Sequence, residues 1–260
     1  MKTTLATLAV AAWLPLSAIG ATIIEYNANT GSTAQNPGVQ GWTESIGSGS
    51  PAPEGAGTET IGGTDWRYWS ISNAGSTFSA TYRFNLAAGD FNDPEGWTAT
   101  AKVRVESAYE SLTATYLQVR DGESQWQILL TRDTTQSQIS YWGVDTDPNQ
   151  RRKVLANYDL AADYIILQLH YDPATEQVGV YVNGVAIGSP LSRAEVPEVS
   201  QTFISFGDSD NSPRAVRTYT YWNQVSFETG YAVIPEPGLS GLMFGGAAAL
   251  FLLAQSRRRA

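Results

Sequence analysis

Short segments that alternate apolar with polar residues recur along this chain and limit it to a small set of folds. They are rich in β-branched and aromatic residues, and we predict strands at residues 77–86, 97–106, 114–120, 125–131, 164–171 and 177–182. Turn-forming pairs such as Asp121-Gly122 and Asn183-Gly184 separate several of them. No long amphipathic helix precedes the C-terminal tail, so the pattern predicts an all-β sandwich.

The chain contains no cysteine, so neither disulfides nor thiolate metal sites can stabilise it. A core of packed side chains must therefore hold the fold, and we predict one domain over residues 21–232. Within it, residues 47–63 are rich in Gly, Ser and Pro, and they are expected to form a flexible loop.

The N-terminus has the layout of a secretory signal peptide over residues 1–20. Lys2 is followed by an apolar stretch from Leu5 to Leu16 and by small residues at Ala18 and Gly20. We therefore predict export, with cleavage after Gly20.

The C-terminal segment 233–260 has three parts. Pro235, Glu236 and Pro237 come first, residues 238–254 form an apolar run long enough for a transmembrane helix, and Arg257, Arg258 and Arg259 follow. The arginines favour a cytoplasmic end, which places the preceding domain across the membrane. An ordinary anchor helix is the alternative interpretation.

This tail resembles the PEP-CTERM sorting signal of Gram-negative bacteria that produce exopolysaccharide. The resemblance implies an exosortase as partner, which recognises Pro235-Glu236-Pro237, and the secretion translocon as another. It implies a protein that is transiently anchored in the inner membrane and is then displayed at the cell surface or in the extracellular matrix.

The part of the chain between the terminal signals is acidic. Four of the 16 basic residues lie in those signals and all 25 acidic residues lie between Glu25 and Glu236, so residues 21–236 carry a net charge of −13. Such a charge repels nucleic acid, and we exclude nucleic-acid binding.

Residues 164–188 encode a strand, a Tyr171-Asp172-Pro173 turn, a second strand and an Asn183-Gly184 hairpin. Together with Phe206-Gly207-Asp208 and Trp222, they resemble the LamG or concanavalin A-like jelly roll over residues 65–228. The resemblance implies a jelly-roll sandwich with Trp222 in a structural position.

Catalytic patterns of jelly-roll enzymes are incomplete here. The Glu-x-Asp-x-x-Glu pattern of laminarinase-type hydrolases is absent, and Glu106 and Glu110 do not replace it. Gln168-Leu169-His170 resembles the Gln-x-His element of alginate lyases, and Arg104-Val105-Glu106 loosely matches their Arg-x-Glu strand. Their third motif has no counterpart, so we expect His170, the only histidine, to be a residue of a sheet face.

One acidic loop is a candidate calcium site. Asp208, Asp210 and Asn211 offer three oxygen ligands close together, but the spacing of an EF-hand is missing and the same residues favour plain turns. Asp145 and Asp147 pose the same question. We predict no cofactor other than this possible calcium.

Aromatic residues are the remaining indication of function, since the chain has eight tryptophans and 13 tyrosines. Exposed aromatic rings stack on sugars in carbohydrate-binding modules. The candidates for such stacking are Trp66, Tyr68, Trp69, Tyr141 and Trp142. We expect a non-enzymatic, lectin-like module with a polysaccharide ligand; the alternatives are a polysaccharide-active hydrolase or lyase and a structural surface protein.

Overall fold

The computed structural model describes residues 21–31, 34–46, 54–74, 80–107, 114–132, 137–144, 151–208 and 217–230. The predicted signal peptide, the Pro-Glu-Pro motif, the apolar run 238–254 and the arginine cluster lie outside these residues. Among the described residues, no helix is long and apolar enough to cross a membrane.

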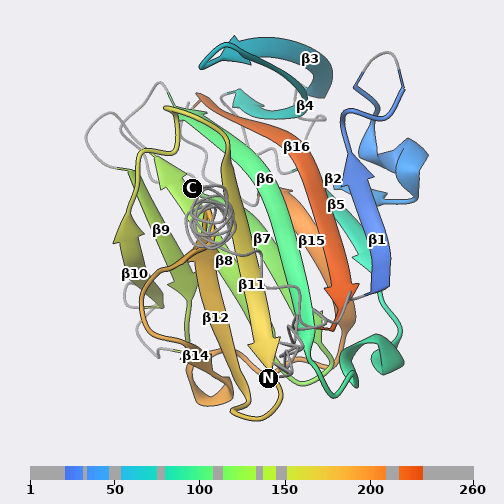
Figure 1. The fold of residues 1–260 in the computed structure, drawn as a ribbon, viewed down its shortest axis with the longest axis vertical. Helices are drawn as coiled ribbons and strands as arrows, with labels where there is room; N and C mark the ends of the chain where they lie inside the picture. The colour runs from blue at the N-terminus through green and yellow to red at the C-terminus, as the bar shows by residue number, and fades with distance from the viewer. Residues whose placement is uncertain are drawn as a thin grey trace, which may run out of the picture.

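Two antiparallel sheets packed face to face form the described part of the chain, as the alternating pattern predicts (Figure 1). The nine-stranded sheet follows the order β13-β12-β11-β6-β16-β4-β3, with β1 beside β16 and β14 beside β12. Its strands are β1 (Ala21–Asn27), β3 (Glu54–Ile61), β4 (Thr64–Ala74), β6 (Trp97–Ser107), β11 (Ile165–Asp172), β12 (Gln177–Val182), β13 (Val185–Ala186), β14 (Leu191–Ser192) and β16 (Arg217–Thr229).

The seven-stranded sheet lies behind the first one in Figure 1 and follows the order β10-β9-β8-β7-β15-β5-β2. Its strands are β2 (Thr43–Ile46), β5 (Ala80–Asn85), β7 (Ala114–Asp121), β8 (Gln125–Arg132), β9 (Ser137–Trp142), β10 (Arg152–Asn157) and β15 (Thr202–Asp208). Three short 3-10 helices lie in connections, η1 (Pro37–Gln40), η2 (Ala88–Phe91) and η3 (Arg193–Glu195). This jelly-roll sandwich is consistent with the predicted concanavalin A-like fold.

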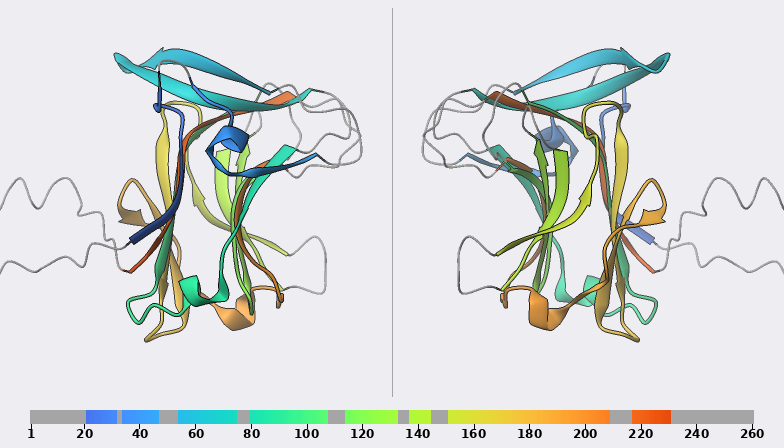
Figure 2. Two further views of the ribbon diagram at one scale, coloured as in Figure 1. Left: turned by 90° about the vertical axis from the view of Figure 1, so that its right-hand side faces the viewer. Right: turned by 90° about the vertical axis from the view of Figure 1, so that its left-hand side faces the viewer.

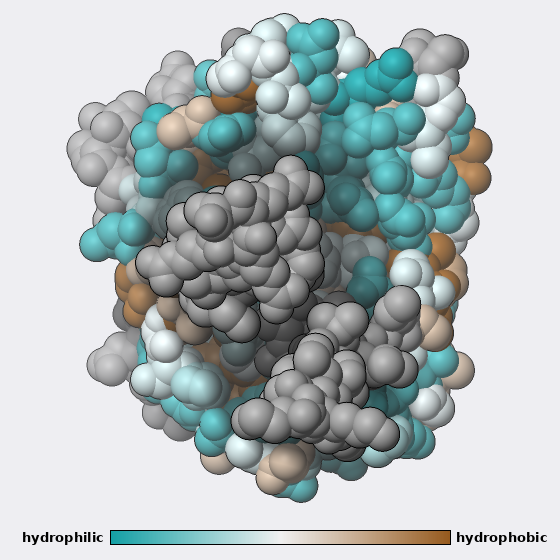
Figure 3. Space-filling model, viewed as in Figure 1, coloured by the Kyte–Doolittle hydropathy of each residue, from teal (hydrophilic) through white to brown (hydrophobic). Residues whose placement is uncertain are grey.

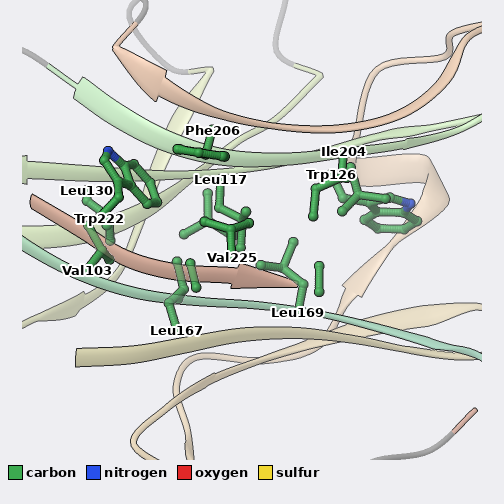
Figure 4. Close-up of a cluster of buried hydrophobic side chains, with 14 of the residues drawn as sticks. Val103, Leu117, Trp126, Leu130, Leu167, Leu169, Ile204, Phe206, Trp222 and Val225 are labelled. Atoms are coloured by element: carbon green, nitrogen blue, oxygen red, sulfur yellow. The ribbon is translucent and has the colours of Figure 1, made fainter. Parts of the chain in front are cut away.

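The core lies between the two sheets, where alternate residues of each strand face inward. Figure 4 shows Leu117, Ile204 and Phe206 of the seven-stranded sheet opposite Leu167 and Val225 of the nine-stranded sheet. All five are fully buried, as is Trp222. The predicted structural role of Trp222 is therefore confirmed, since its ring packs 4.8 Å from that of Phe206.

The predicted loop over residues 47–63 is wrong in its second half, because Glu54–Ile61 forms strand β3. Gly62 and Gly63 both have positive φ and make the two-residue turn into β4. Figure 2 shows this hairpin lying across the top of the sandwich. β3 is an edge strand with a weak apolar pattern, which is why its composition suggests a loop.

Asn183 and Gly184 form the hairpin turn predicted for them, with φ of 52° and 82°. The preceding turn is held by Asp172, whose Oδ1 accepts the Ala174 backbone N–H at 2.9 Å and whose Oδ2 accepts the Thr175 hydroxyl at 2.9 Å. These two hydrogen bonds thus fix the conformation of the turn that joins β11 and β12.

Candidate functional site

Trp66 and Tyr68 project from one face of the β3–β4 hairpin, as strand alternation predicts, but their rings are already engaged. The Trp66 ring centroid lies 4.9 Å from that of Tyr164, and the Lys102 ammonium lies 4.0 Å from the Trp66 centroid. The Tyr68 ring covers Gly57 and meets Tyr221 edge-on at 4.7 Å. These rings hold the hairpin on the outer face of the nine-stranded sheet.

An ion pair beside these rings fixes the same hairpin. Arg104 of β6 donates to both carboxylate oxygens of Glu59 of β3, at 3.1 Å from Nε and 2.5 Å from Nη2. The Tyr164 hydroxyl donates to Glu59 Oε1 at 2.7 Å. Burial opposes the charge on Arg104, but the hydrogen bonds and the charge of Glu59 raise its pKa. In Figure 3, hydrophilic residues gather over this upper part of the face.

The other predicted sugar-stacking residues lie elsewhere. Trp69 packs against the core, and Tyr141 is only 4% exposed within it, so the prediction that Tyr141 stacks on sugars is wrong. Its place in β9 points inward by the alternation of the strand. Trp142 is half-buried on the seven-stranded sheet with the Arg151 guanidinium 6.0 Å from its ring. The five candidates therefore do not form one platform.

An open cleft lies at the opposite end of the outer face, around the turn between β11 and β12. Its volume is about 570 Å³. His170, Gln177 and Tyr181 line it together with the Asp172–Thr175 turn, and Pro94, Glu95 and Pro190 complete its walls. Planar, polar and apolar surfaces thus meet in one accessible depression.

Tyr181 gives this cleft a flat aromatic wall. Gly179 precedes it by two residues on the same face of β12, and a Cβ at Gly179 would lie 2.8 Å from Tyr181 Cε2. The ring therefore rests over the glycine backbone, which only a residue without a side chain allows. Within the part of the chain that the structure describes, no other ring or cation packs on Tyr181.

His170 lies beside this ring, because it pairs with Gly179 across the β11–β12 ladder. Its Nδ1 is 3.1 Å from the Thr98 hydroxyl of β6. Burial lowers the pKa of the imidazole, and the nearby Asp172 carboxylate offsets only part of this effect. His170 is therefore neutral at neutral pH, on a sheet face as expected, and also within a cleft, which the sequence does not reveal.

The lyase-like residues are not brought together. Thr98 pairs with His170, and Arg104 lies six residues further along β6, about 20 Å away at the usual rise per strand residue. Arg104 is moreover bound to Glu59. Arg104 therefore stabilises the β3–β4 hairpin and does not form a lyase-like site with His170.

Carboxylates with raised pKa values lie away from the cleft. Burial raises the pKa of Glu54 to about 7, against the hydrogen bond that it accepts from the Tyr82 hydroxyl. Burial also raises the pKa of Glu228. Neither residue lines the cleft, whereas Asp172, which does, has a lowered pKa because Thr175 and Ala174 donate hydrogen bonds to it.

The predicted calcium site is only partly within the described residues. Asp208 ends β15 and is 2% exposed, whereas Asp210, Asn211, Asp145 and Asp147 lie outside them. Among the described residues, no cluster of three His, Cys, Asp or Glu side chains is suited to a metal. Calcium binding stays a prediction.

No protein-family model matches the sequence, and a search of curated proteins finds none similar to it. The fold is similar to that of the carbohydrate esterase vb_24B_21 from Shiga toxin-encoding bacteriophage phi24B, with a TM-score of 0.59 and 15% identity over 82% of this chain and 100% of that chain. The receptor-binding domain of botulinum neurotoxin D has a TM-score of 0.43 at 10% identity, and this chain, matched over 82% of its length, covers 50% of it. At these identities the likeness concerns the fold.

Proposed function

We propose that the protein is a carbohydrate-binding module whose ligand lies in the cleft at Tyr181. The observation that carries this proposal is the Tyr181 ring, which rests over Gly179 and borders an open cleft of about 570 Å³. A sugar ring can place its C–H groups against such a flat aromatic surface.

Polar groups around the ring suit the hydroxyls of a sugar. The Gln177 amide donates and accepts hydrogen bonds, and Asp172 keeps its charge because its pKa is lowered. The imidazole of His170, whose Nδ1 lies 3.1 Å from the Thr98 hydroxyl, adds a planar polar surface to the cleft. The three prolines of the walls add rigid apolar surface.

A binding function fits these groups better than glycoside hydrolysis does. A hydrolase needs one carboxylic acid with a raised pKa opposite a second carboxylate. The Asp172 pKa is shifted in the opposite direction, and both of its oxygens are engaged in the turn.

A polysaccharide-active enzyme with a histidine base is the second candidate. One observation favours it, because the neutral His170 lies in the same cleft as the Tyr181 hydroxyl. A base of this kind abstracts a proton from a bound sugar and needs no pair of carboxylates. Product formation, which a module without activity lacks, distinguishes the two candidates.

The test is a glycan and polysaccharide array with the full chain, run with calcium and with chelator, and followed by assays for reducing ends and unsaturated products. Tyr181→Ala is expected to lower the glycan affinity about tenfold, because it removes one stacking contact and the apolar area buried there. Tyr219→Ala, which removes a tyrosine from β16 of the same sheet, is the matched control and should bind like the parent.

Binding without turnover supports the module, and turnover that is lost in His170→Ala supports the enzyme. Equal binding by Tyr181→Ala and the parent would remove the cleft from the proposal. An array without any bound glycan favours the third alternative, a structural surface protein. Loss of binding in chelator would support calcium at the Asp208 loop.

We further propose that this module is exported and sorted by an exosortase, on the basis of the N-terminal segment and the Pro235-Glu236-Pro237 tail. Replacing these three residues by alanines should leave an uncleaved, membrane-retained form in a host that carries the exosortase. The measurement is the ratio of processed to unprocessed protein on immunoblots. Equal ratios for variant and parent would contradict recognition of the motif.

A further inference from the structure

Two arginines share one aromatic ring on the outer face of the seven-stranded sheet. Arg83 of β5 and Arg120 of β7 lie on either side of β15 in the strand order, in register with Ser205 and Phe203. The Arg83 guanidinium carbon is 3.9 Å from the Phe203 ring centroid, and that of Arg120 is 4.8 Å away. We call Arg83, Phe203 and Arg120 the arginine clamp.

The clamp lacks the carboxylates that accompany other partly buried arginines of this chain. Arg104 pairs with Glu59, and Arg193 pairs with Asp121 at 3.2 Å and Glu123 at 2.9 Å. Within the described part of the chain, Arg83 and Arg120 have no ion pair, and Nε of Arg120 is buried without a hydrogen-bond partner. Their guanidiniums donate instead to the neutral amides of Asn85 and Gln201.

Holding two cations together without a counterion has a cost. Burial lowers the pKa of Arg120, and the charge of Arg83 lowers it further. A bound anion would relieve this repulsion and could accept hydrogen bonds from the terminal guanidinium N–H groups of the two arginines. Two half-buried guanidiniums that share one ring without a carboxylate therefore have the character of an anion site.

The described strands of this outer face carry no negative charge. By strand register, the described outward-facing residues of the seven-stranded sheet include no Asp or Glu, although residues 21–236 have a net charge of −13. Neighbours of the clamp on this face include Gln118, Gln125, Gln127 and Ser205. Gln118 accepts from the Ser205 hydroxyl at 3.1 Å, and Gln125 donates to Gln127 at 2.9 Å.

We propose that the arginine clamp binds a carboxylate or sulfate group of an acidic polysaccharide. The guanidiniums match the planar, bidentate geometry of such groups. The amides and hydroxyls beside them can bond sugar hydroxyls, which a free inorganic ion does not need. The clamp is on the opposite sheet from the Tyr181 cleft, so it is independent of the function proposed for that cleft.

The experiment measures binding of the full chain to polygalacturonate and to a neutral β-glucan by calorimetry at low ionic strength. The double variant Arg83→Gln/Arg120→Gln should bind polygalacturonate about tenfold or more weakly, because each lost guanidinium removes a charge-assisted hydrogen bond. Arg67→Gln/Arg132→Gln changes the net charge equally away from the clamp and should retain parental affinity. Binding of the neutral glucan should be the same in all three proteins.

Equal polygalacturonate binding by the double variant and the parent would overturn the proposal, as would equal loss in the control variant. If the double variant does not fold in thermal unfolding, Arg83→Gln alone serves, with an expected loss of several-fold. Inorganic sulfate binding as tightly as the polymer would reduce the clamp to an ion site and contradict the polysaccharide. Preference for phosphatidylglycerol vesicles over polygalacturonate would contradict it as well.

Discussion

Arg104→Leu is expected to lower the free energy of unfolding by about 3 kcal/mol. The Arg104 side chain is 8% exposed and that of Glu59 is 20% exposed. Removing the guanidinium leaves the Glu59 carboxylate half-buried, with the Tyr164 hydroxyl as its remaining donor among the described residues. Breaking one partner of a buried pair typically costs about 3–5 kcal/mol, and the partial exposure of Glu59 places this case at the lower end.

Chemical denaturation measures the global loss, and hydrogen exchange locates it. Amides of β3 and the first half of β4 should lose protection most, because Glu59 and Trp66 attach this hairpin to β6 and Tyr164. Arg67→Leu is the matched control in the same hairpin, since the Arg67 side chain donates a hydrogen bond to the Gly31 carbonyl. Similar losses in Arg67→Leu and Arg104→Leu would contradict the special role of the ion pair.

Most strands of the sandwich can be predicted from the sequence because the core imposes a period of two. The strand predicted at residues 97–106 matches β6 to within one residue. The agreement is close because Ala101, Val103 and Val105 face the core while Lys102 and Arg104 face outward. β3 escapes prediction because it covers no core. Its stability comes from pairing with β4 and from contacts with β6, which local composition does not encode.

The candidate site is harder to predict because aromatic residues serve packing and binding equally. Trp66 lies in an aromatic cluster of the kind that stacks on sugars, but Lys102 and Tyr164, which are distant from it in sequence, pack against its ring. Tyr181 has one local signal, a glycine two residues earlier on the same strand face. Neither that signal nor the spacing of Arg83, Arg120 and Phe203 shows which rings and cations meet until the strand order is known.

Gly96→Ala is the second substitution with a large expected effect, a loss of about 3 kcal/mol in the free energy of unfolding. Gly96 precedes β6 with φ of 85°, a conformation that costs alanine about 1 kcal/mol. An added Cβ would lie 2.0 Å from the Tyr171 carbonyl oxygen and 3.0 Å from Pro173 Cδ. The backbone of β11 must move to relieve this contact, and such overpacking costs about 1–3 kcal/mol more.

The same movement would also disturb the cleft, because Pro94, two residues before Gly96, and Pro173, which the added Cβ would meet, both line it. Gly89→Ala is the matched control, since a Cβ at this exposed position of η2 meets nothing within 4 Å. Thermal and denaturant unfolding of both variants, with glycan binding measured on the folded fraction, separates the effects. If Gly96→Ala and Gly89→Ala have the same free energy of unfolding, the close approach of Gly96 to the β11–β12 turn does not depend on the missing side chain. If Gly96→Ala is less stable and its folded fraction also binds glycan more weakly, this one glycine both permits the packing of the sandwich and sets the width of its cleft.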